Sequence, residues 1–160
     1  MPRKNPPAAP AANSAWLAVD AQLCFALYSA SLAMTKLYKP LLEPLGLTYP
    51  QYLAMLVLWE GDGVTVSRLG ERLSLDSGTL TPLLKRLQAQ GLVQRLRDAA
   101  DERRVLLQLT PAGRALKARA ATIPPRVAQA SGCTLDELST LTTRLRDLRQ
   151  HVTDSTPEAA

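Results

Sequence analysis

Hydrophobic positions in the middle of the chain follow two short helical patterns. Leu69, Leu73 and Leu75 predict a short amphipathic helix, and Thr65 is suited to be its N-cap. Turn chemistry at residues 76–78 (Asp-Ser-Gly) starts a second helix with one apolar stripe, formed by Leu80, Leu83, Leu84 and Leu87. Two helices joined by a tight turn are therefore expected, and the second leaves a polar face free.

The start of the second helix has two interpretations. Pro82 would delete a backbone hydrogen bond inside a helix, so Thr81 is an alternative N-cap with Pro82 as the first helical residue. The two starting points differ by about one turn. Gly91 is well placed to end the helix on either interpretation.

Strand patterns follow this helix pair. Apolar and polar residues alternate over residues 92–97 and again over 105–109, which predicts two paired strands. The loop between them carries Arg103, and a guanidinium at the tip of a rigid hairpin can enter a minor groove, where the potential is most negative. The order of helix, turn, helix and basic hairpin predicts a winged helix-turn-helix lobe at about residues 51–110 that reads double-stranded DNA.

Helical patterns flank this lobe. Residues 16–38 contain neither proline nor glycine and predict a long helix that ends at Lys39-Pro40. A short buried helix is expected over residues 51–59. Beyond the hairpin, Thr110-Pro111 predicts an N-cap followed by proline at the first helical position.

Two more signals shape the C-terminal part. Prolines at 124 and 125 must interrupt or kink the helix that begins at residue 111. The pair Thr134 and Glu137 forms a capping box, so the last helix should run from Leu135 to about His151. The predicted fold class is mainly α with a small β-hairpin wing.

The predicted organisation is one domain, residues 14–152, between a flexible arm at 1–13 and a flexible tail at 153–160. The helices at about 14–40 and 111–152 form its dimerisation region. Leucines recur at helical spacing in both: Leu17, Leu23, Leu27 and Leu32 in the first, and Leu138, Leu141, Leu145 and Leu148 in the last. They could pack within one chain or between two, and dimerisation gains weight because two-fold proteins read palindromic sites.

Composition limits the partners. The chain has 160 residues, 46% of them hydrophobic, and a formal net charge of +5. Nine lysines and arginines lie between Lys85 and Arg119 against three acidic residues, which favours a polyanionic partner. No apolar run approaches the roughly 20 residues of a membrane span, and the proline-rich N-terminus is a poor signal peptide. We therefore expect a cytoplasmic protein without a membrane partner.

The two cysteines are the candidates for chemistry. Cys24 shares a predicted helix face with Tyr28, whose hydroxyl can stabilise a thiolate, and Cys133 lies at the start of the last helix, where the helix dipole favours negative charge. The alternative is that Cys24 is an inert core residue. The cysteines do not form a CxxC pair, and His151 is the only histidine, so neither a zinc site nor another cofactor is expected.

Three segments resemble a known family. Residues 75–87 (LDSGTLTPLLKRL), 101–103 (DER) and 23–28 (LCFALY) closely resemble the MarR family of winged helix-turn-helix repressors. Within that family, Cys24 with Tyr28, Tyr38 and Tyr49 makes the chain similar to the organic hydroperoxide resistance regulators (OhrR). The resemblance extends over about Asp20 to Ile123 and more loosely over the last helix.

The resemblance implies a mechanism. Cys24 would be the peroxide sensor in an apolar pocket lined by residues such as Leu23, Phe25 and Leu27, and Tyr38 and Tyr49 would reach its thiolate across a homodimer. An organic hydroperoxide would oxidise Cys24. Cys133 would then close a disulfide with the partner subunit's sensor, as in the two-cysteine members. Disulfide formation would release a pseudo-palindromic operator and derepress a peroxide-detoxification gene. Unlike Tyr38 and Tyr49, Tyr52 is expected to be a core residue.

The roles of the DNA-binding residues can be divided. We predict base or phosphate contacts for Ser77, Thr79 and Thr81, and phosphate contacts for Lys85, Arg86 and Arg95. Arg103 should enter the minor groove, steadied by Asp101. Two other functions stay open: a MarR-type repressor released by a small phenolic ligand, with no redox role for Cys24, and a thiol peroxidase.

Overall fold

A computed structural model of the chain describes residues 14–156. The predicted arm at 1–13 and the last four residues of the predicted tail lie outside these described residues. Of the described residues, 14–36 belong to one compact unit, and 37–156 belong to a second. The elements follow in the order η1 Ser14–Leu17, η2 Val19–Ala21, α1 Leu23–Leu42, η3 Glu43–Leu45, α2 Tyr49–Glu60, β1 Val64–Thr65, α3 Val66–Leu73, α4 Ser77–Ala89, β2 Val93–Arg97, β3 Val105–Leu109, α5 Pro111–Ala120, α6 Ile123–Ser131 and α7 Leu135–Ser155.

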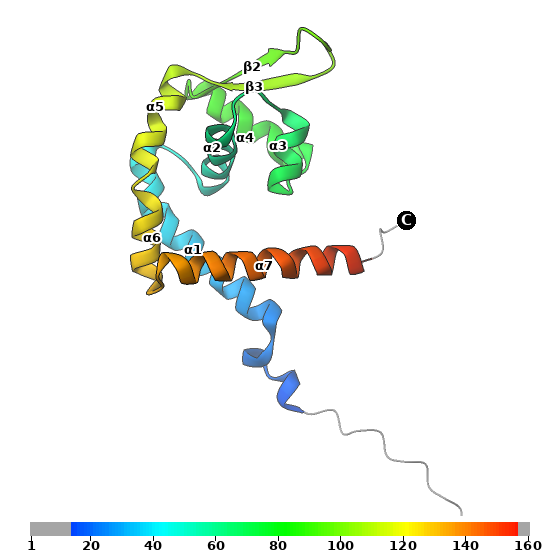
Figure 1. Cartoon of the computed structure of the whole chain (residues 1–160), viewed down its shortest axis with the longest axis vertical. Helices are drawn as coiled ribbons and strands as arrows, with labels where there is room; N and C mark the ends of the chain where they lie inside the picture. Colours follow the sequence, from blue (N-terminus) through cyan, green and yellow to red (C-terminus); the bar gives the residue numbers. More distant parts are fainter. Residues whose placement is uncertain (1–13, 157–160) are drawn as a thin grey trace, which may run out of the picture. The chain divides into compact units, whose positions relative to one another are not determined.

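The second unit contains a winged helix-turn-helix lobe, which we define as residues 49–109 (Figure 1). Its antiparallel sheet has the order β1-β3-β2, with Val64 opposite Leu107 and Val93 opposite Leu109. Helices α2, α3 and α4 lie on one side of the β2–β3 hairpin (Figure 1). The largest fully buried side chains belong mostly to this lobe: Leu42, Met55, Leu58, Leu69, Leu84, Leu87, Val93, Leu107 and Ile123.

The predicted fold class is confirmed, together with several helix signals. Thr65 caps α3 by accepting a hydrogen bond from the Arg68 backbone N–H, and Thr110 caps α5 in the same way from Gly113. Every leucine of the predicted stripe on α4 is buried. Gly91 follows that helix in the left-handed conformation, with φ of 71°. Local capping chemistry and hydrophobic spacing were therefore sufficient to define the centre of this fold.

The prediction for the first long helix was wrong at both ends. Residues 14–21 form two short 3₁₀ segments, and α1 starts only at Leu23 and continues through Pro40 to Leu42. Residues 15–21 are exposed, so they bury no apolar surface that would extend α1 toward the N-terminus. At the other end, Leu41 and Leu42 are buried, and their packing outweighs the single backbone hydrogen bond that Pro40 removes.

The structure also decides where α4 begins. Its N-cap is Asp76, so Thr81 and Pro82 lie inside the helix and the alternative start at Pro82 is wrong. Burial of Leu80, at 2% exposure, requires the helix to begin before the proline. Leu75 was assigned to the preceding helix, but α3 ends at Leu73 and Leu75 lies in the turn.

Other predicted helix boundaries differ from the observed ones by smaller amounts. The helix predicted over 51–59 runs from Tyr49 to Glu60, and the last helix reaches Ser155 instead of about His151, so it includes the first residues of the predicted tail. The prolines at 124 and 125 do separate two helices, but they lie in the first turn of α6, where a missing N–H costs little. The two-residue strand β1 was not predicted, because two residues are too short for an alternation signal.

Candidate DNA-binding surface and redox cysteines

The first turn of α4 is held by the Asp76 carboxylate. Its Oδ1 accepts a hydrogen bond from the Thr79 backbone N–H at 2.7 Å. This bond, the largest contribution, lowers the pKa of Asp76 below its ordinary value, so the cap stays ionised at neutral pH. The cap and the buried stripe leave the opposite side of the helix exposed, and this side carries all the predicted α4 contacts: Ser77, Thr79, Thr81, Lys85 and Arg86.

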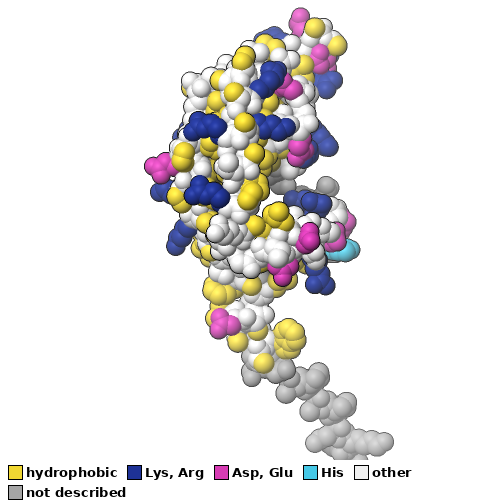
Figure 2. Space-filling model, turned by 60° about the vertical axis from the view of Figure 1, so that its left-hand side comes forward, with side chains coloured by type: hydrophobic (Ala, Val, Ile, Leu, Met, Phe, Trp, Pro, Cys, Tyr) yellow, Lys and Arg dark blue, Asp and Glu magenta, His cyan; other side chains and the backbone are white. Residues whose placement is uncertain are grey.

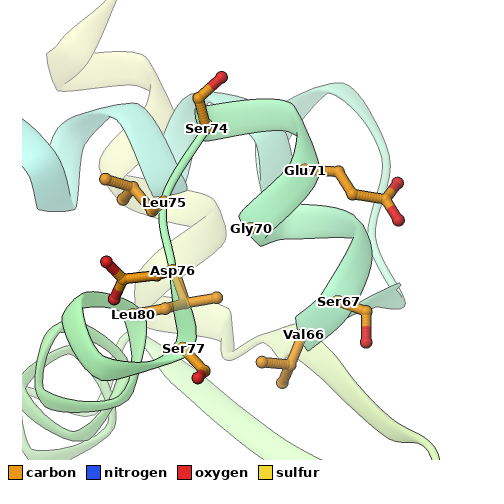
Figure 3. Close-up of a pocket in the computed structure, with 9 residues that line it drawn as sticks. All are labelled: Val66, Ser67, Gly70, Glu71, Ser74, Leu75, Asp76, Ser77 and Leu80. Carbon is orange, nitrogen blue, oxygen red and sulfur yellow. The ribbon is translucent and has the colours of Figure 1, made fainter. Parts of the chain in front are cut away.

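A hollow of about 560 Å³ lies beside this first turn (Figure 3). Asp76, Ser77 and Leu80 border it on one side, and α3 residues such as Val66 and Ser67 border it on the other (Figure 3). The helices meet closely at Gly70, where a Cβ atom would lie 3.0 Å from the Leu75 carbonyl oxygen. The turn between α3 and α4 is therefore fixed by close backbone packing, and it presents Ser77 at the edge of a concave surface.

Two carboxylates organise the wing tip. Asp98 accepts a hydrogen bond from the Ala100 backbone N–H at 2.9 Å and lies 3.8 Å from the Arg104 guanidinium. Asp101 accepts from the Arg103 backbone N–H at 3.1 Å. Among the described residues the Arg103 guanidinium takes part in no ion pair, and the residue is exposed. Asp101 thus fixes the backbone of Arg103 and leaves its charged group available to a ligand.

Arg95 lies on β2 and faces α4. Its Nε donates to Gln88 Oε1 at 3.0 Å, which links β2 to α4. The space-filling view shows lysine and arginine side chains interspersed with acidic ones on the face that it presents (Figure 2). The structure therefore brings the predicted DNA contacts of α4, β2 and the wing onto one lobe.

Cys24 is the second residue of α1 and is a free, exposed thiol. Because α1 starts at Leu23, Cys24 occupies a first turn, where the helix dipole favours negative charge. The neighbouring side chains Leu23, Phe25 and Leu27 are 55%, 41% and 37% exposed. The apolar side chains beside Cys24 are therefore open to solvent to a large extent.

The predicted tyrosines fall into two groups. Tyr28, on α1, is 63% exposed. Tyr38 and Tyr49 are half-buried and pack together, with ring centroids 4.8 Å apart, and Tyr52 is 5.9 Å from Tyr38. The expectation that Tyr52 is a core residue is confirmed, since it is only 3% exposed.

Burial changes the acidity of this tyrosine cluster. It raises the pKa of Tyr38 to about 12, with smaller contributions from Tyr49 and Tyr52, and raises the pKa of Tyr49 as well. The phenols therefore keep their protons at neutral pH. A protonated phenol can donate a hydrogen bond to an anionic sulfur, which is the chemistry expected of Tyr38 and Tyr49.

Cys133 is half-buried between α6 and α7. It follows Gly132, which has φ of 70°, and its thiol lies 3.7 Å from the Ser131 carbonyl oxygen. The next residue, Thr134, begins α7 with the predicted capping box: Thr134 N–H donates to Glu137 at 2.7 Å. Cys133 is thus a free thiol at the N-terminus of a well-capped helix.

Residues 14–156 contain neither a membrane-spanning helix nor a cluster of metal ligands. None of the described helices combines the length and apolar composition needed to cross a membrane. Residues 14–156 also bring together no group of three His, Cys, Asp or Glu side chains that could hold a metal ion.

Comparison with known proteins identifies the family to which this architecture belongs. The family model "Transcriptional regulator SarA/Rot" matches residues 36–120. The chain is 52% identical over 136 residues to the organic hydroperoxide resistance transcriptional regulator of Bacillus subtilis, covering 82% of this chain and 92% of the relative. The chain belongs to the MarR/SarA family of winged-helix transcriptional regulators. Members of this family are regulators, not enzymes, which argues against a thiol peroxidase.

Other members of the family support this assignment. The HTH-type transcriptional regulator TtmR of Methylorubrum extorquens is 51% identical over 134 residues, covering 84% of this chain and 69% of the relative. The crystal structure of AbfR of Staphylococcus epidermidis has a TM-score of 0.75 and 34% identity, covering 91% of this chain and all of AbfR. The structure of reduced AbfR bound to DNA has a TM-score of 0.69 and 33% identity, covering 84% of this chain and 94% of that one.

Some residues that shape this regulator's lobe were missed from the sequence. Asp98 and Arg104 fold the wing, and Thr48 and Gln51 form a capping box at the start of α2. Both had a signal: Asp98 follows a strand and precedes small residues, and Thr48 stands three positions before a glutamine. Pro50 concealed the second signal, because the helix was expected to begin only after this proline, at residue 51.

Proposed function

We propose that this regulator is a homodimeric DNA-binding repressor that organic hydroperoxides inactivate through Cys24. The observation that carries the proposal is the 52% identity to a regulator of organic hydroperoxide resistance, over 92% of that relative's length. An exposed Cys24 thiol supports it, because sulfur reactivity requires access to the oxidant.

The dimer follows from apolar surface that one chain leaves uncovered. Leu17, Leu23 and Leu32 are 80%, 55% and 49% exposed, and α7 has no buried residue although Leu141 and Leu145 recur along it. Fully burying a leucine contributes roughly 1.5–3 kcal/mol, so a second copy that covers these faces would be strongly stabilised. We assign the leucines of α1 and α7 to this interface.

DNA binding is assigned to α4 and the wing. The exposed hydroxyls of Ser77 and Thr79 are suited to base edges and phosphates. Thr81 Oγ1 donates to the Ser77 carbonyl at 2.8 Å, so it is left to accept from a base N–H donor. Lys85, Arg86 and Arg95 are assigned to phosphates. Arg103 is assigned to the minor groove, where its carboxylate-fixed backbone holds the guanidinium at the wing tip.

The redox step is a two-electron oxidation of sulfur. The Cys24 thiolate attacks one oxygen of the hydroperoxide, the O–O bond breaks, and the products are a sulfenic acid and an alcohol. The Cys133 thiol then attacks the sulfenic sulfur, a disulfide forms and water leaves. Because a disulfide requires Cα atoms within roughly 7 Å, closing it constrains the helices that carry the two cysteines.

This proposal also explains release from DNA. The two lobes of a dimer must reach half-sites one helical turn apart, roughly 34 Å, so a small rotation of either lobe misaligns the recognition helices. A loss of about 4 kcal/mol in binding weakens the affinity roughly a thousandfold. The regulated gene would then be transcribed, and we propose that it encodes a peroxide-detoxifying protein.

The DNA assignment can be tested by selecting bound duplexes from a random-sequence pool with the reduced protein. We expect an enriched pseudo-palindrome that binds two chains. Failure to enrich any duplex would refute the repressor function. Non-reducing electrophoresis after treatment with cumene hydroperoxide tests the second cysteine: the wild type should form a reducible covalent dimer, and the Cys133→Ser variant should not.

A hollow next to the tyrosine cluster favours one alternative, release by a small phenolic ligand. It has a volume of about 440 Å³ and is lined by Tyr52, Leu56 and Trp59, with Lys117 at its edge. This volume is within the range of small-molecule sites. The alternative would be supported if a phenol released DNA from the Cys24→Ser variant, and excluded as the main signal if only hydroperoxides acted, and only through Cys24.

A further inference from the structure

The lobe and helix α5 meet at one dense polar junction, for which the proposed function has no role. Its centre is Asp62, in the turn between α2 and β1. One carboxylate oxygen of Asp62 accepts from the backbone N–H groups of Gly63 at 3.0 Å and Leu109 at 2.9 Å. The other lies 2.7 Å from Arg114 Nη2. One side chain therefore joins the α2–β1 turn, the end of β3 and helix α5.

Arg114 completes this link from the α5 side. Its second guanidinium nitrogen, Nη1, donates to the Leu109 carbonyl at 3.1 Å. Arg114 is in the first half of α5, and it therefore connects α5 to the last residue of the wing as well as to Asp62. A guanidinium that bridges two acceptors holds their relative direction more tightly than a single point charge.

Bonds from α2 reinforce the junction. Trp59 Nε1 donates to the Gly113 carbonyl at 2.9 Å, and Lys117 Nζ donates to the Trp59 carbonyl at 3.0 Å. Both bonds join the end of α2 to α5. We call Trp59, Asp62, Gly113, Arg114 and Lys117 the lobe–α5 joint.

The end of helix α4 is also hydrogen-bonded to the start of α5. Thr110, the N-cap of α5, donates through Oγ1 to the Gly91 carbonyl at 2.6 Å, and its N–H donates to the Leu92 carbonyl at 3.1 Å. Gly91 and Leu92 form the turn that ends α4. Thr110 thus ties the end of α4 directly to α5, and the lobe–α5 joint holds α2, against which α4 packs, on the same helix.

We propose that Asp62 and Arg114 are positioning residues for DNA recognition: by fixing the lobe on α5, they set the spacing at which the two lobes of a dimer reach successive half-sites. This inference rests on the proposed function, since it requires a dimer that binds DNA. Neither side chain belongs to the surface assigned to DNA. Their effect would therefore be on the preferred half-site spacing and not on base recognition.

The test uses the operator selected by the wild-type protein and derivatives with one or two base pairs inserted at its centre. Each insertion moves and rotates the second half-site, so the wild type should lose about tenfold or more in affinity. In the Asp62→Asn and Arg114→Gln variants we expect this discrimination to shrink to about threefold or less. A variant that merely folded less well would bind every duplex more weakly by the same factor.

Glu60→Gln is the matched control. Glu60 forms an ion pair with Arg72 that is also 2.7 Å long, but this pair joins α2 to α3 inside the lobe and does not reach α5. The control should keep the wild-type spacing preference. As a second measurement, amide hydrogen exchange over residues 109–117 should accelerate in Asp62→Asn and not in Glu60→Gln.

The outcomes separate the two claims. If the wild type enriches a palindrome and discriminates spacing, but the Asp62 and Arg114 variants discriminate equally well, the positioning role is refuted and the proposed function stands. If the wild type binds no duplex, or prefers no spacing, the dimeric DNA-reading function itself fails and the positioning role falls with it.

Discussion

Replacing Gly113 by alanine tests the close packing between α5 and the end of the recognition helix. An alanine Cβ at this position would lie 2.1 Å from the Leu92 carbonyl oxygen, 3.1 Å from the Leu92 carbonyl carbon and 3.2 Å from a Leu109 methyl group. Ordinary contact distances between heavy atoms are about 3.5 Å, so the backbone of α5 or of the turn must move by about 1 Å.

Two effects of opposite sign determine the result. Alanine favours a helix over glycine by about 0.8–1.0 kcal/mol, whereas overpacking costs typically about 1–3 kcal/mol. The displacement also strains the hydrogen bond from Trp59 Nε1 to the Gly113 carbonyl, and such a bond contributes about 1 kcal/mol. We therefore expect a net loss of about 1–3 kcal/mol. At about 2–4 °C per kcal/mol for a protein of this size, Tm should fall by several degrees.

The assay is thermal unfolding followed by circular dichroism, with Gly78→Ala as control. Gly78 lies in the first turn of α4, where a Cβ would meet only the Asp76 side chain, at 3.2 Å. The Asp76 Oδ1 atom caps α4, so a small shift weakens the cap while alanine favours the helix, and this control should stay within about 1 kcal/mol of the wild type. If the Gly113→Ala variant is as stable as the wild type, or more stable, the reasoning about this junction is wrong.

Three other predictions follow from burial, charge and acidity. Leu84→Ala removes a side chain that is 1% exposed and should cost about 2–5 kcal/mol in urea unfolding, whereas Leu56→Ala, at 36% exposure, should cost less; equal losses would contradict the assigned core. Arg103→Ala should reduce the salt dependence of operator binding by about one counterion, and an unchanged slope and affinity would remove Arg103 from the interface. The pKa of Tyr38 is raised from 10.0 to about 12, so the folded state holds its proton more tightly and this stabilisation should be lost between pH 10 and pH 12. In alkaline unfolding curves Tyr38→Phe should reduce that loss, with a remainder from Tyr49 and Tyr52, whose pKa values are also raised; an unchanged loss would assign it to groups other than Tyr38.

Sequence reasoning succeeded where a structure is determined by neighbouring residues. Caps at Thr65, Thr110 and Thr134 and the leucine stripe of α4 depend on contacts three or four positions apart, which the sequence displays directly. The start of α4 was left open because local rules disagreed about Pro82. Burial of Leu80 against the rest of the lobe decided it, and such tertiary packing is not visible in a short window.

The candidate site shows the same division. The exposure of Thr79, Lys85 and Arg86 follows from helix periodicity, so their common face could be predicted. The lobe–α5 joint could not be predicted, because Asp62 and Arg114 are separated by 52 positions and each alone resembles an ordinary surface charge. Only the folded chain brings them together, and only then does the aspartate gain its three hydrogen-bond donors.

The central claim is that oxidation of Cys24 releases DNA, and one titration tests it most directly. Reduced protein on its selected operator is treated with increasing cumene hydroperoxide, and the bound fraction and the remaining Cys24 thiol are measured in the same samples. We expect the two quantities to fall together in the wild type, while the Cys24→Ser variant stays bound at every dose. Release of the Cys24→Ser variant at the same doses as the wild type would contradict the redox mechanism.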